Sequence, residues 1–207
     1  MTSDSGRERI LDVATRLFAA LGYDGTSTRL IAEAAGLNIA TVAYHVGGKR
    51  DLYLAVMERA HQAERAALET AVADLRRDAP PGGAGGAALL GLVDRYVDFC
   101  AANPAIPALW MHRWLSDAAD VAHLESLYVR PLMDLVVDAV RDVVDDGVDV
   151  EYAVWTVIWA THGFARGGVL DTDGRRRGMD DAAELARFRA HLHRLVASAL
   201  GLPGDAR

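Results

Sequence analysis

Apolar side chains recur along this chain with the spacing of α-helices almost from end to end. The first stripe consists of Ile10, Leu11, Ala14, Leu17, Phe18 and Leu21. Its spacing predicts an amphipathic helix over residues 7–21, and Gly22 and Gly25 predict the end of that helix and a turn. No segment of alternating β-branched residues is long enough to predict a sheet. The pattern therefore predicts an all-α protein of about nine helices.

Two short helices are expected next, on either side of Gly36. Thr26, Ser27 and Thr28 offer capping side chains for the first of them, which should end near residue 35. Two short helices around a tight turn have the sequence shape of a helix-turn-helix, whose second helix enters the major groove of DNA. This segment is therefore a candidate DNA reader.

The second short helix should run from an N-cap at Asn38 to His45. Ile39, Val42 and Val46 have the i, i+3, i+7 spacing of a buried face. The opposite, exposed face would carry Ala40, Thr41, Ala43, Tyr44 and His45. Small residues there allow close approach to base edges and thymine methyl groups, and the polar ones supply hydrogen bonds.

A long fourth helix is predicted from Lys49 to about Arg76, enough to join two units. The proline- and glycine-rich segment 79–86 predicts a loop after it. Further helices are predicted over residues 87–102, 104–116, 120–145, 149–170 and 180–200. Pro131 lies within the third of these, so we expect a kink or a junction of two helices there. The polar run 171–180 predicts a surface loop.

Composition narrows the class of protein. The chain has 207 residues, 51% of them hydrophobic and 25% charged, which is typical of a globular protein. Cys100 is the only cysteine, so no intrachain disulfide can form, and we expect a cytoplasmic protein. Residues 1–6 lack the apolar core of a signal peptide and are expected to be a disordered tail. The apolar stretch 152–170 contains Arg166 and several glycines, so we expect it to be buried in protein and predict no membrane association.

The net charge of −7, from 22 basic and 29 acidic residues, argues against a protein that coats nucleic acid through bulk charge. The acidic excess, however, lies outside the first 60 residues. Residues 1–60 hold seven basic and seven acidic side chains, which leaves fifteen and twenty-two for the rest of the chain. Residues 1–60, called the head, are neutral overall and can present Arg29, Lys49 and Arg50 locally; Lys49 is the only lysine. This distribution favours a DNA-binding head of limited size, with an acidic body of residues 61–207 that does not contact the DNA.

Residues 7–55 resemble the DNA-binding signature of the TetR (tetracycline repressor-like) bacterial transcriptional regulators. The resemblance is carried by Gly22-Tyr23-Asp24-Gly25-Thr26-Ser27, Ile31-Ala32-Glu33-Ala34-Ala35-Gly36-Leu37, Thr41, His45-Val46 and Lys49-Arg50-Asp51-Leu52. It implies a helix-turn-helix DNA-binding domain over residues 7–55, followed by a ligand-binding and dimerisation domain over residues 56–207. It also implies a repressor that binds a palindromic double-stranded operator as a homodimer and is released by a small-molecule inducer.

By motif, the resemblance implies DNA contacts at Thr26, Thr28, Thr41, Tyr44, His45 and Lys49. Ala43 stands where the family most often has an aromatic residue, which shifts the expected aromatic contact to Tyr44. Each of these side chains could instead have a purely structural role. For Thr26 and Thr28, capping a helix would be enough to explain the residue without DNA.

A single head buries too little DNA surface for regulatory affinity, so two copies are expected to read two half-sites. Apolar side chains on the last two predicted helices offer the dimer interface: Trp155, Ile158, Trp159, Gly163, Phe188, Leu192 and Leu195. Two such helices from each copy would form a four-helix bundle, as the resemblance also implies. The alternative is that both helices only complete the core of one chain.

The body also carries aromatic and polar side chains that could bind a small molecule. The candidates are Trp110, Trp114, Tyr128 and His162. Aromatic residues at helical spacing more often fill a core, so packing is the alternative at each position.

The rival classes are a helical metal-binding protein or enzyme and a helical dimeric adaptor without DNA binding. Glu58 and His61 form one Glu-x-x-His motif, whereas a di-iron bundle needs two, with further carboxylates. The sequence has no paired cysteines, zinc-protease motif or nucleophile elbow. We therefore expect a regulator and not an enzyme, with no metal or cofactor.

Overall fold

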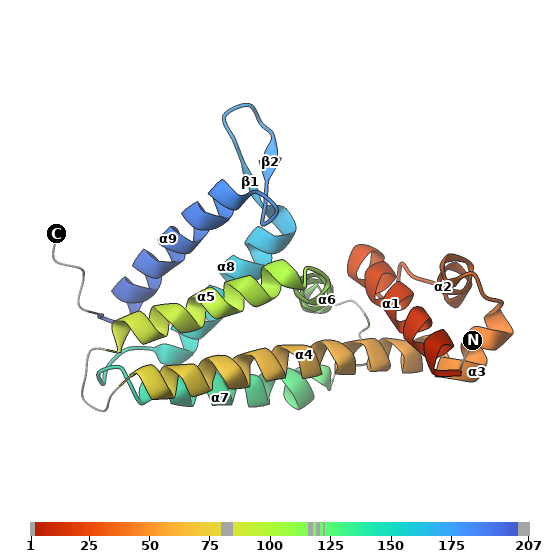
Figure 1. Ribbon diagram of the computed structural model, residues 1–207, viewed down its shortest axis with the longest axis horizontal. Coiled ribbons are helices and arrows are strands. Elements are labelled where there is room, and N and C mark those ends of the chain that lie inside the picture. The colour runs from red at the N-terminus through yellow and green to blue at the C-terminus, as the bar shows by residue number, and fades with distance from the viewer. Residues whose placement is uncertain (1–2, 80–84, 116–117, 119–120, 122, 203–207) are drawn as a thin grey trace. The chain divides into compact units, whose positions relative to one another are not determined.

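The computed structural model describes residues 3–79, 85–115, 118, 121 and 123–202. Its elements are α1 (Ser3–Leu21), α2 (Thr28–Ala35), α3 (Ile39–Val46), α4 (Lys49–Asp78), α5 (Gly86–Ala102), α6 (Ala105–Trp114), η2 (Glu125–Val129), α7 (Arg130–Arg141), α8 (Val150–Gly167), β1 (Val169–Leu170), β2 (Arg176–Arg177) and α9 (Ala182–Ala199) (Figure 1). The predicted all-α fold is confirmed, because the two strands have only two residues each. Within the described ranges, no helix is both long and apolar enough to cross a membrane.

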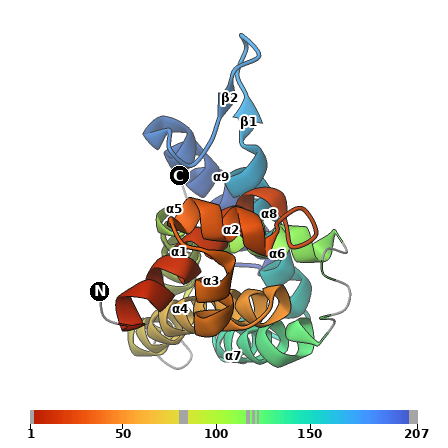
Figure 2. The ribbon, with the colours of Figure 1, turned by 90° about the vertical axis from the view of Figure 1, so that its right-hand side faces the viewer.

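The helices α1, α2 and α3 pack on one another and form a three-helix head (Figure 2). Its core includes Ile10, Phe18, Ile31, Val42 and Leu52, each at most 1% exposed. Helix α6 also packs on α1, so contacts group residues 1–63 with 105–122 and residues 64–104 with 123–207. This grouping differs from the predicted domain boundary after residue 55, which places α6 in the body.

The first helix begins earlier than the sequence pattern indicates. Helix α1 starts at Ser3, so the prediction of a disordered tail is wrong for residues 3–6, while Met1 and Thr2 lie outside the described residues. Gly6 is buried, and a Cβ atom there would lie 3.2 Å from Nε2 of His45. Because Gly6 has no side chain, the first turn of α1 can pack closely against α3. This tertiary contact orders a segment whose composition alone indicates a tail.

Side-chain caps set the ends of α2 and α3, as predicted. Ser27 Oγ accepts a hydrogen bond from the Leu30 amide at 3.1 Å and begins α2. Gly36, with φ of 66°, ends that helix in the left-handed conformation that favours glycine. Asn38 Oδ1 then accepts from the Thr41 amide at 2.7 Å and begins α3. A cap of this kind stabilises a helix by about 1 kcal/mol.

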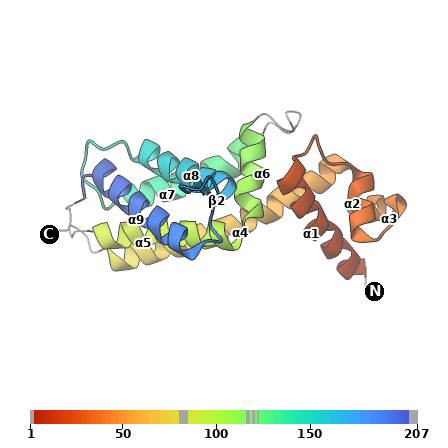
Figure 3. The ribbon, with the colours of Figure 1, turned by 90° about the horizontal axis from the view of Figure 1, so that it is seen from above.

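Helices α5, α7, α8 and α9 form the body together with the end of α4. Helix α5 packs on both α8 and α9, and α7 packs on α8 (Figure 3). Leu75, Val97, Ala139 and Val196 are among the side chains of this core. Pro131 lies in the first turn of α7, directly after the π-helical turn η2, which confirms the predicted junction.

Strands β1 and β2 pair antiparallel between α8 and α9 (Figure 1). The sequence predicts only a surface loop over residues 171–180, because strands of two residues are too short for a periodic signal. Asp171 holds the turn, since its Oδ1 accepts hydrogen bonds from the amides of Asp173 and Arg175 at 3.0 and 2.8 Å. Residues 169–177 therefore form a locally ordered β-hairpin.

Candidate nucleic-acid interface

Helix α3 presents a contiguous exposed face. Ala43 and Tyr44 follow Ile39 and Ala40 by four positions each, so the four residues share one side of this two-turn helix. Ile39 is 50% exposed and Tyr44 is 83% exposed, while both alanines are exposed as well. An exposed aromatic ring of this extent adds nothing to the core of the head, so Tyr44 is available to a partner.

The prediction that Ile39 lies on the buried face is wrong. Val42 is 1% exposed and fixes α3 to the head at its middle, and Val46 is half-buried. The helix has only eight residues and turns by about 100° per residue. A single central anchor therefore leaves Ile39, in the first turn, turned toward solvent.

The predicted threonine contacts are held within the head. Thr26 is 2% exposed, and its hydroxyl donates to the carbonyl oxygen of Gly22 at 2.7 Å. Thr41 Oγ1 donates to Oδ1 of Asn38 at 2.9 Å. Thr28, the first residue of α2, is half-buried. Thr26 thus has a structural role in the turn after α1, and Thr41 reinforces the cap of α3.

His45 lies between α3 and α1. Its ring is half-buried, with Nε2 next to Gly6, and it meets the Tyr44 ring edge-on with the ring centroids 5.3 Å apart. The imidazole therefore contacts both the Tyr44 ring and the first turn of α1.

Lys49 is positioned by an aromatic cluster. Its Nζ lies 4.3 Å from the centroid of the Tyr23 ring, a cation–π contact. Tyr23 in turn meets Tyr53 edge-on at 4.9 Å, and Tyr53 is 1% exposed. Lys49, the only lysine of the chain, is the first residue of α4, and its ammonium group is held against these packed rings. Asp51 Oδ2 accepts a hydrogen bond from the Gly48 amide at 3.1 Å. The arrangement suits an ammonium group that meets a phosphate at a fixed place.

The body exposes a second apolar surface on α8. Tyr152 and Trp159 are 66% and 49% exposed, and Trp155 stacks on Trp159 with the ring centroids 5.5 Å apart. Ile158 and Gly163, also predicted at the dimer interface, are half-buried. These α8 side chains include an aromatic stripe that the described part of the chain leaves open to solvent.

The predicted interface residues on α9 divide between surface and core. Leu195 is half-buried, and Phe188 is half-buried and stacks on Phe164 at 4.3 Å. Leu192 is 0% exposed and belongs to the core of the body. The sequence stripe on α9 mixes two neighbouring faces, and Leu192 is therefore a core residue.

A buried polar cluster lies in the body. Tyr96 Oη and His162 Nε2 are 2.7 Å apart. Burial lowers the pKa of His162 to about 4. Burial, together with Cys100 and Glu64, raises the pKa of Tyr96 well above its usual range, and burial also raises the pKa of Cys100. His162, Tyr96 and Cys100 are all neutral at pH 7. Glu64, 7% exposed, was not predicted to belong to a site, although its position four residues before the buried Leu68 marks it as inward-facing.

The four predicted ligand residues lie in different parts of the chain. Trp110 and Trp114 belong to α6 in the first unit, whereas Tyr128 and His162 belong to the second. All are buried except Trp114, which is half-buried.

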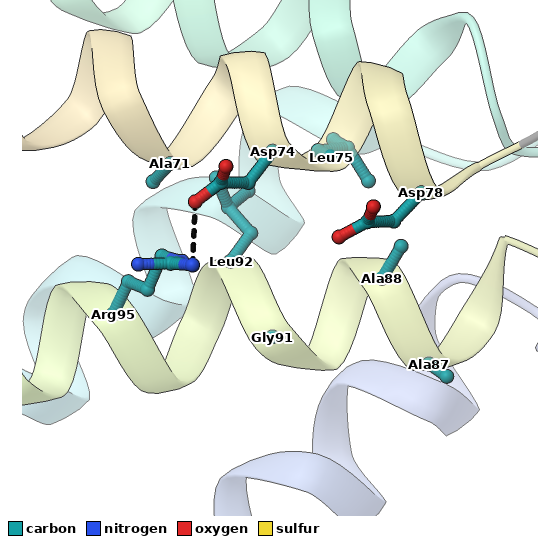
Figure 4. Close-up of a pocket in the computed structure, with 9 residues that line it drawn as sticks. All are labelled: Ala71, Asp74, Leu75, Asp78, Ala87, Ala88, Gly91, Leu92 and Arg95. Atoms are coloured by element: carbon teal, nitrogen blue, oxygen red, sulfur yellow. Dashed lines mark ion pairs between the residues drawn. The ribbon is translucent and has the colours of Figure 1, made fainter.

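A groove of about 300 Å³ between α4 and α5 contains none of these four residues (Figure 4). It is lined by Ala71, Asp74, Leu75, Asp78, Ala87, Ala88, Gly91, Leu92 and Arg95. Asp74 pairs with Arg95 across it at 2.5 Å, so these two charges compensate each other.

Comparison with known proteins relates the head to one family. Residues 10–56 match the family model described as "Bacterial regulatory proteins, tetR family". The probable HTH-type transcriptional regulator YttP of Bacillus subtilis is 32% identical over 71 residues, 34% of either chain. The HTH-type transcriptional repressor AcnR of Corynebacterium glutamicum is 38% identical over 52 residues, 25% of this chain and 28% of AcnR. The matched segments thus span about a third of these curated relatives.

The fold as a whole also has a solved counterpart. HlyIIR, a hemolysin II transcriptional regulator, matches with a TM-score of 0.65 over 96% of this chain and 98% of its own, at 19% identity. At this identity the likeness to HlyIIR is one of fold.

Proposed function

We propose that this chain, which belongs to the tetR family of bacterial regulatory proteins by its residues 10–56, is a DNA-binding transcriptional regulator. The observation that carries the proposal is the exposed face of α3, from Ile39 to Tyr44, next to the positioned Lys49. A helix of this width enters the major groove, and an ammonium group at its edge pairs with a phosphate. The proposed DNA contacts are Tyr44 and Lys49 with the exposed edge of α3, supported by Thr28, Thr41 and His45.

The regulator would act as a repressor on a palindromic operator. Two heads related by a two-fold axis read two half-sites about one helical turn apart. A dimer needs a self-complementary surface, and the aromatic stripe of Tyr152, Trp155 and Trp159 on α8 would supply one. Phe188 and Leu195 are the proposed interface residues on α9. Trp159→Asp should give the mass of a single chain at micromolar concentration in a sedimentation experiment. An unchanged dimer would place the interface elsewhere.

A small-molecule inducer would bind in the body and release the DNA. Tyr128 and His162, both in the second unit, are the ligand residues proposed for this site, whereas Trp110 and Trp114 lie in the first unit. Thr161, fully buried next to His162, has a hydroxyl without a hydrogen-bond partner among the described residues. A ligand hydroxyl or carbonyl would satisfy it. Operator release by compounds found in a thermal-shift screen of the wild type, and its loss in Thr161→Val, would test this assignment.

A gel shift with the purified full-length protein and the DNA flanking its own gene tests the central proposal. Lys49→Ala should weaken binding to all sequences about equally and make the slope of log K against log salt less steep by about 0.9 per lost phosphate contact. Arg141→Ala is the matched control, because Arg141 is an exposed cation of the body. Specific binding that survives Lys49→Ala and Tyr44→Ala together would refute the assignment. A protein without any specific binding would instead be a dimeric adaptor or a metal-binding helical protein.

A further inference from the structure

The exposed face of α3 is mainly apolar. Ile39, Ala40 and Ala43 present methyl and methylene groups to solvent, and Tyr44 adds an aromatic ring. An isoleucine that is 50% exposed at the start of a helix contributes little to the core of the head, which is anchored by Val42. Burying it against a partner removes apolar surface from water and favours binding.

The polar side chains of α3 already have partners within the head. Asn38 Oδ1 accepts hydrogen bonds from both the amide and the hydroxyl of Thr41, at 2.7 and 2.9 Å. The His45 ring packs against Gly6 and Tyr44. No arginine, lysine, glutamine or glutamate occurs between Asn38 and Val46, so the long side chains that most often read guanine and adenine by paired hydrogen bonds are missing from this helix.

Apolar side chains can recognise one base directly in the major groove. Thymine carries a C5-methyl group there, and alanine or other aliphatic side chains contact it. Arg29, Lys49 and Arg50 lie outside α3, and phosphate contacts from them would position the helix without adding sequence information.

Resting on the proposed DNA-binding function, we propose that α3 selects its half-site through thymine methyl groups, which Ile39, Ala40 and Ala43 contact directly. Tyr44, next to this patch, contacts the backbone or an adjacent base. The operator half-site therefore carries neighbouring thymines at the positions that α3 covers.

The test removes the methyl group and nothing else. The full-length protein first selects duplexes from a random-sequence library, which yields its preferred half-site. That duplex is then synthesised with deoxyuridine in place of each thymine in turn, because deoxyuridine pairs with adenine but lacks the C5-methyl group. Affinity should fall about fourfold for each contacted methyl group. Deoxyuridine outside the half-site serves as the control and should leave affinity unchanged.

A variant assigns the contact to this helix. Ile39→Ala should bind the thymine duplex more weakly, with a smaller difference between the thymine and deoxyuridine duplexes than the wild type shows. Ile39 is half-exposed, so the variant should melt near the wild-type temperature, and the wild-type comparison does not depend on the variant.

The two levels of the proposal fail differently. Tight, specific binding that is indifferent to deoxyuridine at every position, or selected half-sites without thymine, would overturn the thymine-methyl assignment and leave the DNA-binding function standing. Absence of any sequence-specific binding would overturn the proposed function and, with it, this inference.

Discussion

Lowering the pH should destabilise the protein through one buried imidazole. His162 is 1% exposed in α8, and burial lowers its pKa from 6.5 to about 4. The groups that face it include the Tyr96 hydroxyl, and Cys100 and Glu64 adjoin that hydroxyl. The folded state resists protonation while the unfolded state accepts it. The stability due to neutral His162 is therefore complete above pH 6.5 and is lost as the pH falls toward 4.

The size of the effect follows from the two pKa values. With 6.5 for the unfolded chain and about 4 for the folded chain, the free energy of unfolding falls by about 1 kcal/mol at pH 5.5. The loss grows to about 2–3 kcal/mol at pH 4.5. Such a change is a large fraction of the stability of a typical domain.

Urea unfolding followed by tryptophan fluorescence at pH 7.5, 5.5 and 4.5 measures the loss. Carboxylates also titrate in this range, so the comparison is with His162→Gln, which keeps a polar group of similar reach and has no proton to gain. This variant is expected to be less stable at pH 7.5, but its stability should fall less on acidification, by the amounts given above. Equal pH dependence in the two proteins would refute the reasoning.

Three further substitutions test the packing that supports the sites. Thr26→Val should lower the free energy of unfolding by about 1–3 kcal/mol, because the buried Gly22 carbonyl loses its donor; thermal melting measures this, and an unchanged melting temperature contradicts it. Asn38→Ala should cost about 1 kcal/mol at the start of α3, seen as faster amide exchange in that helix, with no change elsewhere. Leu192→Ala should cost about 2–5 kcal/mol and leave the proposed dimer intact, whereas Trp159→Ala should weaken that dimer. Equal effects of the two substitutions on dimer dissociation would return Leu192 to the interface.

The helices and their caps were predictable because local rules determine them. A period of 3.6 residues is visible wherever one face of a helix is buried, and a capping side chain or glycine acts within a few residues. Ser27, Gly36 and Asn38 therefore stand at their predicted boundaries. The fold class followed from the same signals, and so did the candidate reading helix.

The remaining features depend on contacts that have no local signal. Ile39 has the spacing of a core residue, yet an eight-residue helix anchored at Val42 leaves it exposed. The sequence around Gly6 predicts a disordered tail, but in the fold Gly6 lies next to His45 of another helix. Leu192 and Leu195 belong to one apolar stripe in sequence, but only the neighbouring helices decide which side chain reaches the core. These wrong predictions concern which helices contact one another in the fold, whereas the predicted caps of α2 and α3 were correct.

The net charge of the head bears on how α3 would distinguish one DNA sequence from another. Residues 1–60 are neutral overall, with seven basic and seven acidic side chains, so phosphate attraction is limited to a few placed cations such as Lys49. Phosphate contacts raise affinity for every sequence alike and leave discrimination unchanged. A head with few of them would bind competing DNA weakly, and its preference for an operator would have to come from the bases. The side chains that face outward on α3 are Ile39, Ala40, Ala43 and Tyr44, so the proposed discrimination would rest on apolar contact and shape.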